Sequence, residues 1–208
     1  LSEVVAQFGD ARRTEILADS ERDVIEVEEE EADEDVVVTV SHHGFVKRMP
    51  MHLYRRRVAS GKALAEMEKH EEDYIERLFV ARTSGWILAF TAGGHCHFLP
   101  VADLPESGRA SRGQSVYSLR RGASRGDRIV ATLPVEDLEQ DRMLVFVSVN
   151  GMVKRTGLAE CSRPRAGGVT AAGIRKDDHM LEVVLSDGDG ELMVLTRAGR
   201  AIRFPESD

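Results

Sequence analysis

The sequence predicts an all-β protein built as a propeller-like array of blades, and three observations lead to this prediction. A hairpin pattern with an apolar strand, a short polar turn and a second strand recurs at 36–50, 86–100, 144–157 and 192–205. The turn glycines, at intervals of 50, 57 and 48 residues, are Gly44, Gly94, Gly151 and Gly199. An Arg/Gly/Ser-rich loop and an apolar return strand follow each of the first three hairpins. Repeats of this length and content are typical of one blade per repeat.

The repeats divide residues 36–208 into about three blades and the start of a fourth. The loops occupy 54–63, 106–115 and 162–170, and the return strands occupy 75–81, 128–135 and 180–186. The first three blades therefore cover about 36–85, 86–142 and 143–190. Residues 64–73 fit either a short helix or an ordered loop.

Two segments precede the blades. Residues 1–18 begin with apolar side chains at helical spacing, and Gly9 is a plausible helix stop, which predicts the last turns of a longer helix. Residues 19–35 are strongly acidic, and a block of like charge cannot build a core, which predicts a solvated linker. The chain starts without Met and stops within the fourth repeat, so we expect a fragment of a longer protein.

The charge is unevenly distributed along the chain. The formal net charge is −8, but residues 1–35 hold 14 acidic and 3 basic side chains, and the remainder is mildly basic at +3. The sequence has no apolar run long enough to span a membrane and no signal-peptide pattern. Cys96 and Cys161 form no disulfide framework, and this suits a reducing cytoplasm.

Three phrases of the chain resemble one known family. They are FGDARRTEI (8–16), EDVVVTVSHHGFVKR (34–48) and GRAIRF (199–204), and together they resemble the C-terminal domain of DNA gyrase A. The related C-terminal domain of topoisomerase IV is the near neighbour. The resemblance implies a β-pinwheel of four-stranded antiparallel blades that exchange strands, preceded by the end of a coiled-coil helix over residues 1–18.

The resemblance also implies a function. The family domain is non-catalytic, binds duplex DNA without sequence preference, and bends or wraps it around a basic rim. It thereby presents DNA to the cleavage core of an ATP-dependent type IIA topoisomerase and supports supercoiling. The implied partners are double-stranded DNA, the catalytic core of the same polypeptide and the ATPase subunit, in a nucleoid-associated cytoplasmic complex without membrane. No cofactor is expected on this chain, because ATP and Mg²⁺ would bind other domains.

One motif departs from the family pattern. Gyrase domains carry the basic heptapeptide Gln-Arg-Arg-Gly-Gly-Lys-Gly in the first blade's loop, and the matching window here is 57–63, where only Gly61 and Lys62 keep their places. This change leaves open a topoisomerase IV-like domain that bends DNA without supercoiling. A propeller-like protein-interaction platform is a further alternative. The acidic linker, besides being a tether, is a candidate competitor of DNA for the basic surface.

Basic side chains recur at matching positions of successive repeats. Arginine suits a track of phosphates because its guanidinium can contact a phosphate through two nitrogens. The candidate DNA contacts in the Arg/Gly/Ser-rich loops are Arg55, Arg56, Arg57, Lys62, Arg109, Arg112, Arg163 and Arg165. The candidates in the second strands of the hairpins are Lys47, Arg48, Lys154, Arg155 and Arg203. We do not expect primary contacts from Arg120, Arg121, Arg125 and Arg128, which lie in a return segment.

No motif predicts catalysis or a metal site. Strand alternation places Cys96 on one face and both His95 and His97 on the other, so this trio is predicted to be structural. His42 and His43 are predicted to form a hairpin turn. None of the tyrosines stands in a setting that resembles a topoisomerase nucleophile. The chain alone is therefore not expected to be an enzyme, and the catalytic tyrosine would lie outside it.

Overall fold

The structure is a computed structural model that describes residues 33–55, 73–108, 111–119, 127–161 and 167–207. Residues 31–208 form one compact unit, and only this unit is described below. The predicted helix (1–18), most of the acidic linker and most of 64–73 lie outside the described residues. No helix within the described ranges is long and apolar enough to cross a membrane.

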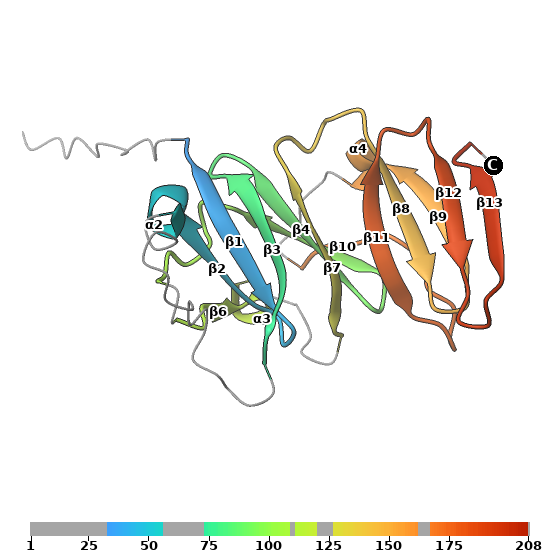
Figure 1. The fold of residues 1–208 in the computed structure, drawn as a ribbon, viewed down its shortest axis with the longest axis horizontal. Coiled ribbons are helices and arrows are strands. Elements are labelled where there is room, and N and C mark those ends of the chain that lie inside the picture. Colours follow the sequence, from blue (N-terminus) through green and yellow to red (C-terminus); the bar gives the residue numbers. More distant parts are fainter. Residues whose placement is uncertain (1–32, 56–72, 109–110, 120–126, 162–166, 208) are drawn as a thin grey trace, which may run out of the picture. The chain divides into compact units, whose positions relative to one another are not determined.

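The first blade is an antiparallel sheet with the strand order β3-β1-β2-β6 (Figure 1). Its strands are β1 (Asp35–Ser41), β2 (Phe45–Pro50), β3 (Ile75–Arg82) and β6 (Gln114–Ser115). A short helix, α2 (Met51–Arg55), follows β2. His42 and His43 form the turn between β1 and β2, as the sequence predicts.

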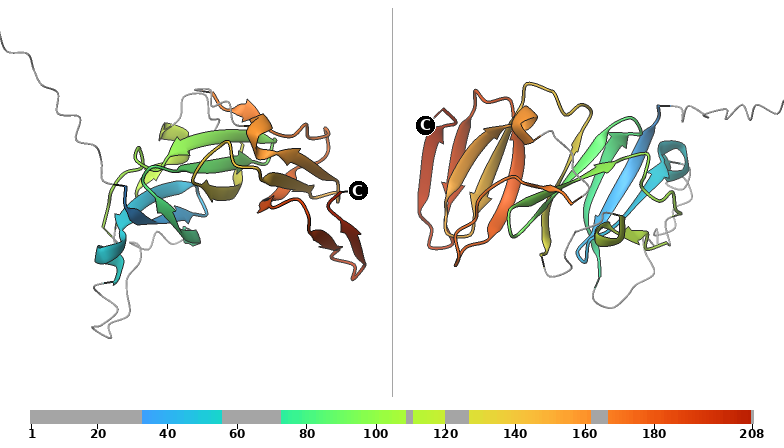
Figure 2. Two further views of the ribbon diagram at one scale, coloured as in Figure 1. Left: turned by 90° about the horizontal axis from the view of Figure 1, so that it is seen from above. Right: turned by 180° about the vertical axis from the view of Figure 1, so that it is seen from behind.

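The second blade has the equivalent order β7-β4-β5-β10. Its strands are β4 (Trp86–Thr91), β5 (His95–Pro100), β7 (Ile129–Val135) and β10 (Val169–Thr170). Another short helix, α3 (Val116–Leu119), lies between β6 and β7. The sheets follow one another in sequence order (Figure 2).

Among the described residues, the two remaining blades have fewer strands than the first two. The third blade pairs β11-β8-β9 and the fourth pairs β12-β13. These strands are β8 (Met143–Ser148), β9 (Val153–Gly157), β11 (Met180–Ser186), β12 (Glu191–Leu195) and β13 (Ala201–Pro205). The helix α4 (Leu158–Cys161) follows β9.

Successive repeats exchange a strand. By sequence β6 belongs to the second repeat, yet it pairs with β2 of the first, and β10 of the third repeat pairs with β5 of the second. Gly113 and Gly168 precede these two strands, with φ of 82° and 80°. A Cβ at Gly113 would lie 2.3 Å from the Val46 carbonyl oxygen, so only glycine lets the exchanged segment approach β2 so closely. The predicted all-β fold with strand exchange is confirmed.

Two apolar clusters hold the blades together. One packs the first blade on the second around residues such as Val38, Val46 and Ile87, and the other packs the second on the third around Phe90 and Phe146. The two phenylalanine rings meet edge to face with centroids 5.7 Å apart. Because both faces of β4 are covered, its sequence is an unbroken apolar run rather than an alternating one.

An aspartate closes each of the first three hairpin turns. Asp73, Asp127 and Asp178 each stand just before a return strand and accept a hydrogen bond from a backbone amide in the turn. The amide-to-carboxylate distances are 3.0, 2.7 and 3.1 Å. These caps fix the turn end of each blade, where the hairpin turn and the start of the return strand meet. They were not predicted, although an Asp two residues before Ile or Met recurs in all three repeats.

Candidate nucleic-acid interface

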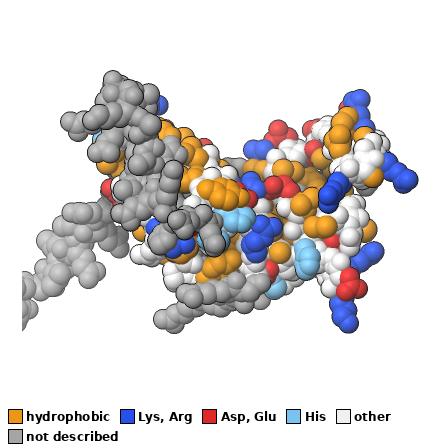
Figure 3. All heavy atoms as spheres, turned by 60° about the horizontal axis from the view of Figure 1, so that its bottom comes forward, with side chains coloured by type: hydrophobic (Ala, Val, Ile, Leu, Met, Phe, Trp, Pro, Cys, Tyr) orange, Lys and Arg blue, Asp and Glu red, His pale blue; other side chains and the backbone are white. Residues whose placement is uncertain are grey.

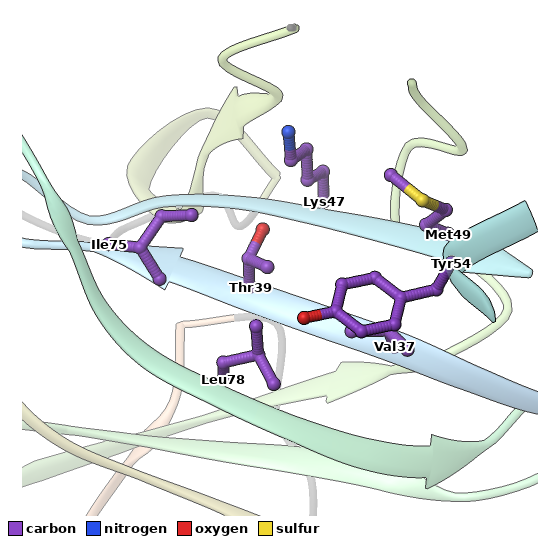
Figure 4. A pocket seen from close by; sticks show the side chains of 7 residues that line it. All are labelled: Val37, Thr39, Lys47, Met49, Tyr54, Ile75 and Leu78. Atoms are coloured by element: carbon purple, nitrogen blue, oxygen red, sulfur yellow. The ribbon is translucent and has the colours of Figure 1, made fainter. Parts of the chain in front are cut away.

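Lys47, predicted to contact DNA, is a structural residue. Its side chain is buried, with 2% of the residue exposed, and its Nζ donates to the carbonyl oxygens of Gly108 at 3.1 Å and Ser111 at 2.6 Å. A buried ammonium group needs such acceptors to compensate for lost water. The stem of Lys47 lines a small apolar pocket with Met49 and Tyr54, while its Nζ points away from them (Figure 4). Lys47 therefore holds the loop before β6, and its ammonium group is engaged by carbonyl oxygens of the protein.

Arg48, the next predicted DNA contact, is also buried. Only 9% of the residue is exposed. Its backbone amide donates to the Pro105 carbonyl at 3.0 Å, and its carbonyl accepts from the Ser107 amide at 3.1 Å. The loop from the second repeat therefore lies along this part of β2 and covers Arg48. The alternation of apolar and polar residues along β2 could not predict that both of its faces are buried, because the loop that covers the second face comes from a distant part of the sequence.

Arg112 lies at the edge of the first blade, where it is engaged by two neighbours. Its guanidinium carbon stands 3.7 Å from the centroid of the Phe45 ring, and its Nη2 is 3.2 Å from the buried carboxylate of Asp73. Burial alone would raise the pKa of Asp73, but hydrogen bonds from the His43 amide, the Ser41 hydroxyl and Arg112 hold that pKa below its ordinary value. Asp73 is thus charged at neutral pH, and Arg112 neutralises it.

The basic pair on β9 is exposed. Lys154 Nζ donates to the Ala171 carbonyl at 3.3 Å and lies 5.9 Å from the centroid of the Phe146 ring. Arg155 Nη1 donates to the Gly188 carbonyl at 3.2 Å. Neither forms an ion pair within the part of the chain that the structure describes. Both retain donors and accessible charge for a phosphate.

Of the other predicted contacts, the structure describes only Arg55 and Arg203. Arg55 ends α2 and is exposed, whereas the exposed Arg203 pairs with Glu191 on the neighbouring strand β12. The remaining candidates lie outside the described residues, and they are Arg56, Arg57, Lys62, Arg109, Arg163 and Arg165.

A second group of cations gathers at the turn ends of the blades; of these only Arg128 was considered from the sequence, and it was not expected to be a primary contact. Five residues there are exposed and form no ion pair among the described residues: Arg128, Arg175, Lys176, Arg197 and Arg200. We call them the turn-end cations. Figure 3 brings this end forward and shows Lys and Arg side chains over it, with some acidic side chains between them.

Local structure explains the placement of the turn-end cations. The Ala92 amide donates to the Arg128 carbonyl at 2.8 Å, so Arg128 lies beside the second hairpin turn. The Asp178 amide donates to the Arg175 carbonyl at 3.0 Å, which places Arg175 beside the third. Arg197 lies in the fourth turn and Arg200 directly after it. In the sequence, the turn-end cations share one feature: each lies within a few residues of a turn glycine or a capping aspartate. None of them belongs to an Arg/Gly/Ser-rich loop. The exclusion of Arg128 as a contact remains untested.

The chain matches the profile of the family described as DNA gyrase C-terminal domain, beta-propeller. The match covers residues 35–81, 86–136, 142–186 and 190–208. These four segments correspond to the four hairpin repeats. The matched residues make up most of the chain.

Curated relatives resemble the chain along nearly its whole length. DNA gyrase A of Haemophilus influenzae is 41% identical over 207 residues, which are 100% of this chain and 23% of that protein. DNA gyrase A of Escherichia coli is 39% identical over 97% of this chain and 23% of that protein. DNA gyrase A of Halalkalibacterium halodurans is 34% identical over 100% of this chain and 25% of that protein. The chain thus spans about a quarter of these relatives.

Solved structures agree with the fold. A crystal structure of the C-terminal domain of DNA topoisomerase IV superposes with a TM-score of 0.71 at 30% identity, over 85% of this chain and 53% of that chain. A structure of the DNA gyrase A C-terminal domain superposes with a TM-score of 0.61 at 19% identity, over 83% of this chain and 55% of that chain. With four matched repeats and strand-exchanged blades, the chain belongs to the DNA gyrase C-terminal domain family.

Proposed function

We propose that this chain binds duplex DNA without sequence preference and bends or wraps it for the cleavage core of a type IIA topoisomerase. The observation that carries the proposal is the series of exposed cations on successive blades of a gyrase-family array. Lys154, Arg155 and the turn-end cations supply positive charge that no described carboxylate neutralises. Regularly repeated blades can meet successive phosphates, and phosphate contacts do not depend on base sequence.

A salt titration tests the DNA-binding proposal. If about six phosphates are neutralised, the logarithm of the binding constant should fall with the logarithm of salt concentration at a slope near −5. The measurement is a gel shift with random-sequence duplex at several salt concentrations. A protein-interaction platform would show no such binding. The absence of a salt-dependent shift would therefore overturn the proposal.

Wrapping and simple bending are distinguished by DNA topology. Gyrase-like wrapping is favoured by the relatives' identity over the whole chain. Bending without supercoiling is favoured by the altered 57–63 window and by the likeness to the topoisomerase IV domain. We propose wrapping as the first candidate. Relaxing circular DNA in the presence of the chain and then removing protein should leave a shifted linking-number distribution, whereas bending alone should leave it unchanged.

We also propose that the chain contributes no catalytic group and needs no cofactor. Two of its described tyrosines have structural surroundings: Tyr74 stacks on His42 with ring centroids 4.9 Å apart, and the Tyr117 hydroxyl donates to the Asp127 carbonyl at 3.1 Å. Burial raises the pKa of Tyr117, which disfavours a phenolate nucleophile. The catalytic tyrosine, ATP and Mg²⁺ would belong to the core and the ATPase subunit of a cytoplasmic, nucleoid-associated complex.

A further inference from the structure

The return strands of the first three blades share one irregularity. In β3, β7 and β11 the pairing register shifts by one residue, which leaves Glu76, Val130 and Leu181 as the extra residues. The next residue of each strand therefore occupies an equivalent position, and these are Arg77, Ala131 and Glu182. The three strands follow one another in Figure 1, with β7 in contact with both others.

The side chain of Arg77 reaches from the first blade to the third. Its Nη2 donates to the carbonyl oxygen of the bulge residue Val130, in the second blade, at 3.1 Å. The same nitrogen lies 2.9 and 2.8 Å from the two carboxylate oxygens of Glu182, in the third blade. The equivalent residue of the middle blade is Ala131, which offers no charge. One guanidinium thus contacts all three return strands.

We propose that the Arg77–Glu182 ion pair is an inter-blade staple that sets the angle between the first and third blades, and with it the curvature imposed on DNA. The proposal rests on the DNA-bending function proposed above. Neighbouring blades are joined by apolar clusters, whose attraction is non-directional. Within the described residues, each apolar cluster spans only adjacent blades, whereas this ion pair spans non-adjacent ones.

A directional contact between non-adjacent blades is sensitive to their relative rotation. A rotation that separates the first and third return strands lengthens the ion pair directly. The Arg77 and Glu182 side chains are 30% and 41% exposed, so salt screens their attraction in part. We therefore expect the angle between the first and third blades, as well as the affinity for DNA, to change with ionic strength.

A pair of neutralising variants tests the staple. Glu182→Gln removes one negative charge and the inter-blade ion pair. Asp187→Asn also removes one negative charge and one ion pair, with Arg142 at 2.9 Å, but that pair joins the residue directly before β8 to the residue directly after β11 and does not reach the first blade. The net charge, and any general effect of charge on DNA binding, is therefore the same in both variants. Only Glu182→Gln should alter the relation between blades.

The first measurement uses the free protein. Spin labels at His52→Cys in the first blade and Met152→Cys in the third report the inter-blade distance, because both positions are exposed. Burial raises the pKa of the native thiols Cys96 and Cys161, which favours labelling of the introduced cysteines. Glu182→Gln should broaden the distance distribution and shift it to longer values, and Asp187→Asn should reproduce the parent distribution. Identical distributions in the two variants would overturn the staple.

The second measurement uses end-labelled duplex DNA at saturating protein. Fluorescence transfer between the ends should fall for Glu182→Gln relative to Asp187→Asn, while both variants keep equal affinity. The exchanged variant Arg77→Glu with Glu182→Arg should restore transfer and the label distance. Altered label distances with unaltered transfer would overturn the link to DNA curvature. Failure of the parent to bind DNA would overturn the proposed function, and the spin labels would still decide the staple.

Discussion

The same two residues, Lys followed by Arg, stand at matching places in the first and third blades and meet opposite environments. Lys47-Arg48 and Lys154-Arg155 both begin three residues after a turn glycine. In the first blade the loop that leads to β6 covers the pair, and both residues are buried. In the third blade no described strand covers β9, and both residues are exposed. A basic side chain on a hairpin strand therefore becomes structural or accessible according to whether a neighbouring repeat covers it.

The second blade supports this comparison. The residue equivalent to Lys47 and Lys154 is His97, which is buried. A Cβ at Gly168 would lie 2.8 Å from its Nδ1, so the segment leading to β10 lies directly on this histidine. Wherever an exchanged strand is present, the position three residues after the turn glycine lies beneath the incoming loop.

The largest effect is expected from adding a side chain where the exchanged loop meets β2. Gly113→Ala forces a Cβ to within 2.3 Å of the Val46 carbonyl oxygen and places alanine at φ 82°, so we expect a loss of roughly 2–4 kcal/mol in the free energy of unfolding. Gly151→Ala is the control, because its φ is 81° but the added Cβ meets nothing within 4 Å; its cost should be about 1 kcal/mol. Denaturant unfolding measures both, and equal losses would contradict a close approach at Gly113.

Replacing the two lysines should separate stability from DNA binding. Lys47→Met leaves the Gly108 and Ser111 carbonyls without their donor and should lower the free energy of unfolding by about 1–3 kcal/mol. Lys154→Met should change stability by less than about 0.5 kcal/mol, and it should reduce the salt slope of DNA binding by about 0.9. Urea unfolding and salt-dependent gel shifts provide the two measurements. A stability loss at Lys154 as large as that at Lys47 would remove the contrast between the blades.

The turn-end cations should contribute to DNA affinity without contributing to stability. Arg197→Gln with Arg200→Gln should lower the salt slope by about 1.8, since each lost phosphate contact contributes about 0.9. Arg203→Gln is the matched control, because Arg203 already pairs with Glu191 and should alter the slope less. If Arg203→Gln proves the more damaging change, the DNA path follows the hairpin strands rather than the turns.

The smallest effect is the acid sensitivity of the first turn. The pKa of Asp73 is held below its ordinary value of 3.8, so its carboxylate stabilises the fold at higher pH and loses this contribution as pH falls below 3.8 through the folded-state value. The difference in unfolding free energy between the parent and Asp73→Asn should be full at pH 6 and shrink below pH 3.8. Asp189→Asn, at an exposed position, provides the control. A difference that grows on acidification would contradict the assigned shift.

The hairpins and return strands were largely predictable because their signals are local. The predicted return strands 75–81 and 180–186 correspond to β3 and β11, which end at Arg82 and Ser186. Apolar runs bounded by turn residues determine such elements with little help from the rest of the chain. The two-residue strands β6 and β10 were missed, because they lie inside loops with no strand pattern and form only against a partner from another repeat.

The sequence by itself determined the repeat, the turn glycines, the all-β class and the family resemblance, since each depends on residues that are neighbours along the chain. Only the tertiary structure decided which cations are accessible. Burial of Lys47 and Arg48, neutralisation of Arg112 by Asp73, and the reach of Arg77 to Glu182 all join residues at least 39 positions apart. Side-chain charge is a property of the residue, whereas its exposure and pairing are set by whichever distant segment packs against it.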